Sequence, residues 1–287
     1  MNYTQARFYL LRTLTPLHAG SGETEFGVID NRVQRDINTG LPTIHASSLK
    51  GALKEFFKEM GGEKMDDIFG KEATEENPNT KPGGCKFLSG DMLSRPVRSD
   101  VVPWFQGTTA ELLTGLQHKA DMLGAQLPGE LVTFIQQVTQ GDQPGREKPR
   151  VFDKAYEGAC AEETGWTAQL EERAVPDAVQ HLLGQRPMLM HTRDMSELEL
   201  PVVARNHLEN GKSENLWYEE IVPYDTRFGF FVVGSGELLD AFEEVVNHQT
   251  VQVGANATIG YGLCRLTRPG TPSATTGSSV HNEAVVH

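Results

Sequence analysis

Between residues 17 and 53 the chain reads Leu17-His18-Ala19-Gly20-Ser21-Gly22, then Val28-Ile29-Asp30, then Ile44-His45-Ala46-Ser47-Ser48-Leu49-Lys50-Gly51-Ala52-Leu53. This stretch combines a glycine-rich loop, an acid after an apolar pair, and a hydroxyl-rich helix start that carries a lysine. Glycine lets a backbone approach a ligand closely, and the N-terminus of a helix favours anions. The stretch therefore predicts a loop-to-helix unit that can hold a phosphodiester chain.

A predicted strand precedes this stretch and a predicted helix ends it. Apolar residues alternate along residues 4–14, which is typical of a strand with a partly covered second face. Glycine and proline are frequent in residues 15–45, which predicts a long loop. Ser47 is the expected N-cap of a helix whose apolar residues recur at helical spacing and which ends at Gly61-Gly62.

The middle of the chain predicts two insertions. Residues 61–84 are polar and acidic and predict an exposed insertion. Residues 86–97 predict a return to the sheet as a strand. Residues 105–190 contain helical patterns at 110–123, 129–138 and 176–183, separated by loop signals, and predict an inserted helical subdomain.

The last third of the chain returns to alternating elements. Asn210-Gly211 is a turn signal between two extended segments and predicts a protruding β-hairpin. Strands are expected at 225–233, 250–253 and 258–267, with a helix around residues 238–246. Strand and helix thus alternate at both ends of the chain, which favours an α+β fold with a ferredoxin-like unit, the topology of the RNA-recognition motif. The last residues predict a disordered tail.

Charge limits the possible functions. The net charge is −13, which argues against a freestanding nucleic-acid binder, because affinity for a polyanion depends on Lys and Arg. Residues 1–60, however, hold seven Lys and Arg against six acids. The acidic excess therefore lies in residues 61–287, and local RNA binding near the N-terminus stays compatible with the composition.

Other features of the composition predict an ordinary cytoplasmic protein with no membrane partner. No apolar run reaches the roughly 20 residues of a membrane span, and the first residues lack the pattern of a signal peptide. Cys85, Cys160 and Cys264 lie far apart, without a paired cysteine or histidine nearby. They predict small buried side chains rather than a disulfide framework or a zinc site.

The helix start at Ser47, Ser48 and Lys50 allows three interpretations. Helix amides, two hydroxyls and a lysine all favour phosphate oxygens. A capped helix with surface lysines explains the same residues structurally. The pattern also matches the Ser-x-x-Lys motif of acyl-enzyme hydrolases, but the accompanying Ser-Asp-Asn and Lys-Thr-Gly elements are absent from this sequence, which disfavours a hydrolase.

Three further features have a functional and a structural interpretation. Asp30 can bind a divalent ion or act on a ribose 2′-hydroxyl, or it can be a turn residue. His18 can be a general acid or a structural histidine. The glycine-rich loop over residues 254–262 can hold an anion with its amides or close a β-hairpin, and its spacing favours the hairpin.

Taken in order, several motifs resemble the RAMP superfamily, and within it the repeated backbone subunit of type III-B (Cmr-type) CRISPR effector complexes. The resemblance extends from residue 14 to residue 265. Its motifs are Leu14 to Gly22, Gly27-Val28-Ile29-Asp30 with Val33-Gln34-Arg35, Thr39-Gly40-Leu41-Pro42 with Ser47 to Gly51, Pro96-Val97-Arg98-Ser99, Leu216-Trp217-Tyr218-Glu219-Glu220, and Val253 to Gly262.

The resemblance implies one domain over residues 1–270, followed by a tail over 271–287. A modified ferredoxin-like palm is expected from residues 1–60, 85–104 and 221–268. The insertions would be the acidic segment 61–84, the helical segment 105–190 and a thumb hairpin over 191–220.

The resemblance also implies a function. The protein would bind a guide crRNA together with further copies of itself and other subunits, and would cleave bound target RNA at regular intervals. Asp30 would be catalytic and would hold Mg²⁺ or another divalent cation, with His18 in support. The residues implied to contact RNA are Gly20, Ser21, Arg35, Ser47, Ser48, Lys50, Lys54, Gly254, Asn256 and Gly260. The alternative within the same class is a structural RNA-binding backbone without cleavage.

Overall fold

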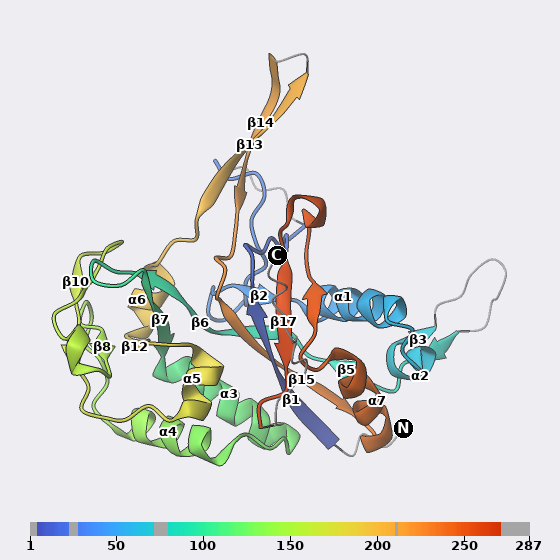
Figure 1. The fold of residues 1–287 in the computed structure, drawn as a ribbon, viewed down its shortest axis with the longest axis horizontal. Coiled ribbons are helices and arrows are strands. Elements are labelled where there is room, and N and C mark those ends of the chain that lie inside the picture. Colours follow the sequence, from blue (N-terminus) through green and yellow to red (C-terminus); the bar gives the residue numbers. More distant parts are fainter. Residues whose placement is uncertain (1–4, 23–27, 72–79, 210–211, 271–287) are drawn as a thin grey trace, which may run out of the picture.

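The computed structural model describes residues 5–22, 28–71, 80–209 and 212–270. One large mixed β-sheet crosses the molecule, helices pack on both of its faces, and a long hairpin stands away from the body (Figure 1). The combination of helices with one large mixed sheet confirms the mixed α and β class that the sequence predicted. Within the described residues no helix is long and apolar enough to span a membrane.

Four antiparallel strands form the centre of the sheet. They are β1 (Gln5–Thr13), β15 (Arg227–Gly234), β6 (Gly90–Arg98) and β17 (Leu263–Thr267), in the order β6-β15-β1-β17. In β1, Tyr9 and Leu11 pack into the core on one face, and Phe8 and Leu10 into the core on the other. The predicted strand at 4–14 is confirmed, and its double-sided apolar pattern reflects burial of both faces.

Helices α1 (Ala46–Glu59), α2 (Met65–Phe69) and α7 (Gly236–Val246) are associated with one core. The expected N-cap at Ser47 is wrong, because α1 begins at Ala46 and His45 is its N-cap. Strand β2 (Thr43–Ile44) pairs with β6 up to Ile44, so His45 is the first residue free to turn into a helix. The predicted end at Gly61-Gly62 is confirmed within two residues.

The other face packs against α3 (Ala110–Leu123), α4 (Gly129–Gln140) and α5 (Asp177–Leu183), and the three predicted helices are confirmed. The same segment also extends the sheet through β7 (Trp104–Thr109), β12 (Pro187–Met190), β8 (Arg150–Val151) and β11 (Gln169–Leu170). The expected helical subdomain is therefore present, but the segment also contributes strands that the sequence did not predict. Strand β12 is buried throughout, and a short apolar run has no periodicity that separates strand from helix.

The segment 61–84 is not fully exposed as predicted. Ile68 and Phe69 of α2 are buried, and the Phe69 ring stacks on Phe87 with the ring centroids 5.1 Å apart. These two apolar residues belong to the core, although the composition of the segment is polar. Residues 72–79 lie outside the described residues.

The predicted hairpin is confirmed as β13 (Val202–Glu209) and β14 (Lys212–Glu220), which pair antiparallel. Its turn at 210–211 and the predicted tail at 271–287 lie outside the described residues. The expected start of the hairpin at residue 191 is too early, because α6 (Thr192–Glu197) precedes it.

The remaining elements are short. They are β3 (Gly70–Lys71), β4 (Lys81–Pro82), β5 (Lys86–Phe87), η1 (Lys154–Tyr156), β9 (Cys160–Ala161), β10 (Trp166–Thr167), β16 (Thr250–Gln252) and η2 (Ala257–Ile259). Cys85 and Cys264 are buried as predicted, whereas Cys160 is only half-buried.

Candidate functional site

The long loop after β1 is fastened to the base of the hairpin. Isolated β-bridges join Leu17 to Val222, Asn31 to Glu219, Gly20 to Val33, and Arg35 to Pro42. Its described residues before β2 form no helix or strand, as predicted, yet these bridges hold the loop in one place. The loop, the hairpin base and the loop over 254–262 together form the candidate site.

Two adjacent acids at the end of β14 organise this site. Glu219 and Glu220 are each only 5% exposed. Successive side chains of a strand point to opposite faces, so the two carboxylates reach two different sets of partners. A buried carboxylate is costly unless it is paired and hydrogen-bonded, and both of these are.

Glu220 holds the loop that contains Asp30. Its Oε2 accepts a hydrogen bond from the Val33 N–H at 3.1 Å, and its Oε1 accepts one from Nη2 of Arg35 at 2.5 Å. Arg35, expected to contact RNA, thus has one of its guanidinium nitrogens engaged inside the protein. The second guanidinium nitrogen of Arg35 donates to the Gly40 carbonyl.

Glu219 holds the other side of the site. Its Oε2 accepts hydrogen bonds from Nε of Arg205 at 3.1 Å and from Nδ2 of Asn256 at 2.9 Å. The Arg205 guanidinium also lies over the Tyr261 ring, 4.6 Å from its centroid. Glu219 therefore joins the hairpin to the loop over 254–262.

Asp30 is exposed and is fixed by the hairpin edge. The N–H groups of Asp30 and Asn31 both donate to the Tyr218 carbonyl, at 3.0 and 3.1 Å. In return the Tyr218 N–H donates to Oδ2 of Asp30 at 2.8 Å. The carboxylate is thus held in one place while it faces solvent, which suits a group that accepts a proton or binds a cation.

His18 is buried beneath this loop. It is 5% exposed, and its Nδ1 lies 2.7 Å from the Glu220 carbonyl oxygen. A carbonyl only accepts, so Nδ1 carries the proton, and Nε2 faces Oε1 of Glu219 at 3.8 Å. The imidazole therefore connects the loop to the hairpin base from inside.

The glycine-rich loop over 254–262 packs against the backbone of His18. The Ala255 N–H donates to the His18 carbonyl at 2.8 Å. Gly254 has φ +79°, and a Cβ atom there would lie 2.4 Å from the same carbonyl oxygen. Since β16 and β17 pair on either side, the predicted hairpin is confirmed.

Several other predicted RNA-contacting residues converge on the same place. Nε2 of Gln34 donates to the Gly20 carbonyl at 3.0 Å and to Oγ of Ser48 at 2.8 Å, which ties the loop to the start of α1. The Ser21 N–H donates to the Arg32 carbonyl. The sequence did not predict the structural roles of Gln34, Arg205, Glu219 and Glu220. For the two glutamates a signal was available, because they are a pair of acids at the end of the predicted hairpin.

The remaining predicted residues are accessible but are not tied into the cluster. Ser47 is exposed on the first turn of α1, and Lys50 and Lys54 lie half-buried along the same helix. Within the described residues, no hydrogen bond or ion pair of the Lys50 or Lys54 side chain is found. Gly260 is exposed and faces open space.

The fold combines a mixed sheet with a projecting hairpin, and a carboxylate is held at the base of that hairpin. Comparison with known proteins identifies the class of protein that has this fold. The RAMP superfamily matches residues 10–265 of the chain. The chain belongs to the RAMP superfamily, as the sequence motifs predicted.

Two relatives are similar in sequence. The CRISPR system Cmr endoribonuclease Cmr4 of Pyrococcus furiosus is 30% identical over 292 residues, which cover 90% of this chain and 93% of that protein. The CRISPR system CMR subunit Cmr4 of Saccharolobus solfataricus is 34% identical over 116 residues, 39% of this chain and 37% of that protein.

Solved structures share the fold. A chain of the type III-B Cmr-beta complex bound to cognate target RNA aligns with a TM-score of 0.77 and 26% identity, covering 92% of this chain and 97% of that chain. A chain of oligomeric Cmr4 from Pyrococcus furiosus aligns with a TM-score of 0.67 and 23% identity, with the same coverage. The second likeness shows the fold alone.

Proposed function

We propose that this protein is the guide-RNA-binding backbone subunit of a type III-B CRISPR complex, and that it cleaves the bound target RNA at regular intervals. Its relative over nearly the whole chain is named as a Cmr endoribonuclease, and a similar chain occurs in a complex bound to cognate target RNA. Its partners are the guide crRNA, the target RNA, further copies of itself and other subunits. The observation that carries the cleavage proposal is the exposed Asp30 carboxylate held at the base of the hairpin.

The ferredoxin-like palm is part of this proposal. Strands β1, β6, β15 and β17 with helices α1 and α7 follow the chain order β-α-β-β-α-β, and the sheet order β6-β15-β1-β17 supports that topology. The hairpin is the thumb of this palm. The segments 61–84 and 105–190 are its insertions, and residues 1–270 form one domain.

Asp30 acts on a ribose of the target RNA in the proposed reaction. The carboxylate orients the 2′-hydroxyl and takes its proton, and the freed 2′-oxygen forms a bond to the adjacent phosphorus. The bond from phosphorus to the 5′-oxygen breaks, and a proton from solvent completes the leaving hydroxyl. The products are a 2′,3′-cyclic phosphate and a 5′-hydroxyl end.

A divalent cation such as Mg²⁺ fits the site only together with RNA. The described residues contain no group of three His, Cys, Asp or Glu side chains that could hold a metal ion. Mg²⁺ binds through one or two carboxylates and otherwise through phosphates and water, so Asp30 alone can supply the protein ligand. When bound, the ion would stabilise the negative charge that develops on the phosphate.

Guide contacts come from the residues around Asp30. Ser47, Ser48 and Lys50 at the start of α1, with Lys54 one turn on, present hydroxyls and ammonium groups to a phosphate backbone. The other proposed guide contacts come from the two loops. They are Gly20, Ser21, Arg35, Gly254, Asn256 and Gly260. His18 is a positioning residue in this scheme, because its imidazole is buried and hydrogen-bonds the Glu220 carbonyl instead of facing the RNA.

The test is target cleavage by the assembled complex with Mg²⁺. Asp30→Asn keeps the size of the side chain and removes its charge, and Asp36→Asn makes the same change elsewhere in the loop. We expect Asp30→Asn to abolish regularly spaced cuts at unchanged guide occupancy, and Asp36→Asn to cleave normally. Assembly without cleavage by the wild type would support the non-cleaving backbone, and small-molecule turnover by the isolated chain would support the Ser47 and Lys50 hydrolase.

A further inference from the structure

Three arginines stand side by side across the central strands, away from the Asp30 site. Arg12 of β1 lies directly opposite Arg227 of β15 in the register, and directly opposite Arg265 of β17 on its other side. Residues opposite one another in neighbouring strands share one face of the sheet. Like charges in such positions destabilise a sheet, so the row needs a compensating anion.

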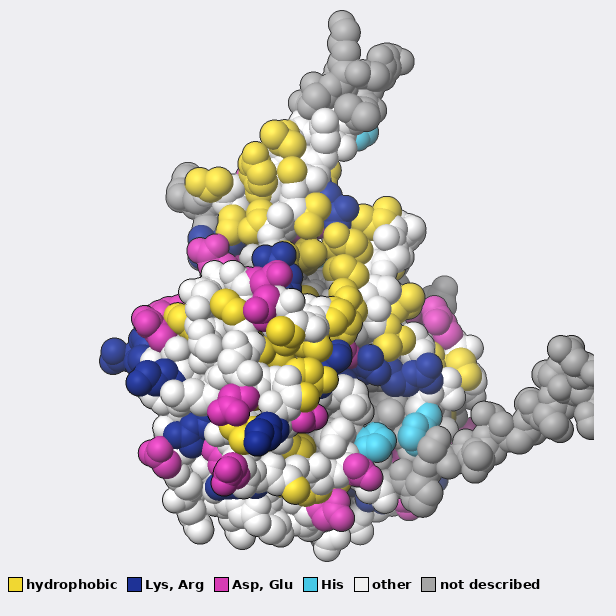
Figure 2. Space-filling view, turned by 60° about the vertical axis from the view of Figure 1, so that its left-hand side comes forward, with side chains coloured by type: hydrophobic (Ala, Val, Ile, Leu, Met, Phe, Trp, Pro, Cys, Tyr) yellow, Lys and Arg dark blue, Asp and Glu magenta, His cyan; other side chains and the backbone are white. Residues whose placement is uncertain are grey.

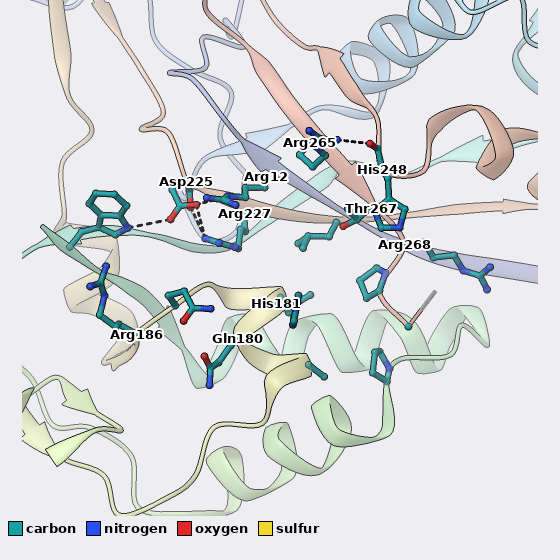
Figure 3. A pocket seen from close by; sticks show the side chains of 18 residues that line it. Arg12, Gln180, His181, Arg186, Asp225, Arg227, His248, Arg265, Thr267 and Arg268 are labelled. Carbon is teal, nitrogen blue, oxygen red and sulfur yellow. Dashed lines mark hydrogen bonds and ion pairs between the residues drawn. The ribbon is translucent and has the colours of Figure 1, made fainter. Parts of the chain in front are cut away.

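The row lies in a cleft of about 630 Å³ between the sheet and α5 (Figure 3). Two further arginines, Arg186 and Arg268, and the histidines His181 and His248 also line it. Asp225 is the only carboxylate among the described lining residues. Arg268 is paired with Glu243, and the other four arginines leave the cleft basic in a chain whose net charge is −13.

Asp225 neutralises only part of this charge. Its Oδ1 accepts from Nε of Arg12 at 2.5 Å and lies 3.3 Å from Nη1 of Arg227. The Arg265 side chain donates to the His248 carbonyl, which carries no charge. One carboxylate thus faces the positive charges of a three-arginine row, and the row keeps a net positive charge.

Arg227 is buried in the wall of the cleft. The residue is 5% exposed, and its Nε has no hydrogen-bond partner among the described residues. The same holds for Nε of Arg186 and Nε2 of His248, which line the same cleft. Buried donors are rarely left unpaired in native proteins, so the unpaired Nε atoms of Arg227 and Arg186 show that the described part of the protein does not itself satisfy every donor of these two guanidinium groups.

The backbone of Gly184 packs closely against the Arg227 guanidinium. Gly184 follows α5 with φ +104°, and a Cβ atom there would lie 2.5 Å from Nη1 of Arg227. Only glycine leaves room for the guanidinium while adopting that backbone conformation. Burial lowers the pKa of Arg227 to about 10, which is still far above neutral pH, so the group stays charged.

The chemistry of the cleft favours nucleic acid over an acidic protein segment. Arginine forks match phosphate oxygens, and Trp104 adds an aromatic ring to the same wall. Basic side chains beside an aromatic surface are how single-stranded nucleic acids are held without sequence preference. On the face drawn in Figure 2, dark blue Lys and Arg side chains gather in a band beside histidines.

We infer that this arginine row is a second RNA-binding surface, which holds the phosphate backbone of a single-stranded segment separately from the contacts around Asp30 and α1. The inference does not depend on cleavage by Asp30. It assigns the phosphates to the row Arg227–Arg12–Arg265 and a stacked base to Trp104.

The test uses the full chain with a short RNA that contains 4-thiouridine, and maps photocrosslinks by mass spectrometry. We expect a crosslink in the peptide that contains Trp104. Arg265→Gln should lose it, and should reduce the slope of log affinity against log salt by about 1, the change expected for one lost phosphate contact. Arg193→Gln removes an exposed arginine outside the cleft and should change neither measurement.

Further arms separate the possible results. Lys50→Gln should weaken total RNA binding but keep the Trp104 crosslink, so failure of the guide site and failure of the cleft are distinguishable. No crosslink at Trp104 in the wild type would overturn the inference. Competition by a poly-glutamate peptide as strong as by unlabelled RNA would overturn it too, in favour of an acidic protein partner. Without RNA, Arg265→Gln should unfold at a higher urea concentration, because one like charge leaves the row.

Discussion

The backbone N–H of Tyr218 donates a 2.8 Å hydrogen bond to Oδ2 of Asp30, although 188 positions separate them in the chain. The hairpin therefore sets where the carboxylate stands. Any displacement of β14 moves the group proposed to act on RNA, while the guide contacts along α1 belong to a different element. Cleavage and guide binding should respond differently to changes in the hairpin base.

Glu220→Ala should separate these two activities. It removes the acceptors of the Val33 N–H and of Arg35, which leaves a buried donor unpaired and costs about 2 kcal/mol in the free energy of unfolding. We expect target cleavage to fall at least tenfold at equal guide occupancy, because the Asp30 loop loses its anchor. Glu220→Gln retains an acceptor and should recover part of the lost stability and part of the lost cleavage. Urea unfolding and cleavage assays on the assembled complex measure the two effects, and equal loss of guide binding and cleavage would contradict the prediction.

Gly254→Ala and Gly260→Ala form a matched pair. Both residues have positive φ, +79° and +82°, so an alanine costs about 1–2 kcal/mol at either position. Only at Gly254 would the new Cβ meet the His18 carbonyl oxygen. Gly254→Ala should therefore destabilise the protein clearly more than Gly260→Ala, as measured by the urea midpoint. Equal midpoints would show that the loop shifts to accommodate the methyl group.

The three cysteines should react at different rates with iodoacetamide. Burial raises the pKa of the Cys85 thiol to about 11 and raises the pKa of Cys264 still further, so almost no thiolate is present at pH 8. Cys160 is half-buried and should be labelled first. Mass spectrometry of the labelled peptides measures the order, and all three should react at similar rates in 8 M urea. Early labelling of Cys85 in the native protein would contradict the burial.

Asp91 should make stability depend on pH. Burial raises its pKa although Lys119 donates a hydrogen bond to it, so the folded protein holds this proton more tightly than the unfolded chain. The stabilisation from the protonated carboxyl is complete below the unfolded pKa of about 4 and is lost as pH rises through the folded pKa.

Asp91→Asn imitates the neutral form and tests this dependence. The variant should be at least as stable as the wild type at pH 7 and should lose that advantage at pH 3.5. Urea unfolding at the two pH values measures it, with Asp240→Asn on the surface as the control. A variant that is less stable than the wild type only at pH 7 would show that the ion pair with Lys119 outweighs burial.

Local patterns predicted most of the regular structure. The helices at 110–123, 129–140 and 177–183 and the strand at 5–13 follow from apolar spacing, and the hairpin follows from Asn-Gly between extended segments. The short strands β8, β11 and β12 were missed, since elements of two to four residues are too short to show a period. The N-cap was misplaced because pairing of β2 with β6, and not the Ser47 hydroxyl, decides where α1 begins.

By itself the sequence determined the α+β class, the RAMP resemblance, and Asp30 as the candidate catalytic group, because these depend on spacing and on motifs read in order. The tertiary structure alone decided that Glu219 and Glu220 bind the loops on either side of the hairpin base, and that Arg12 stands between Arg227 and Arg265. Those contacts join residues far apart in the chain. Strand register decides which of these side chains become neighbours. Burial then requires the charged ones among them to be paired, because a buried charge without a partner is costly.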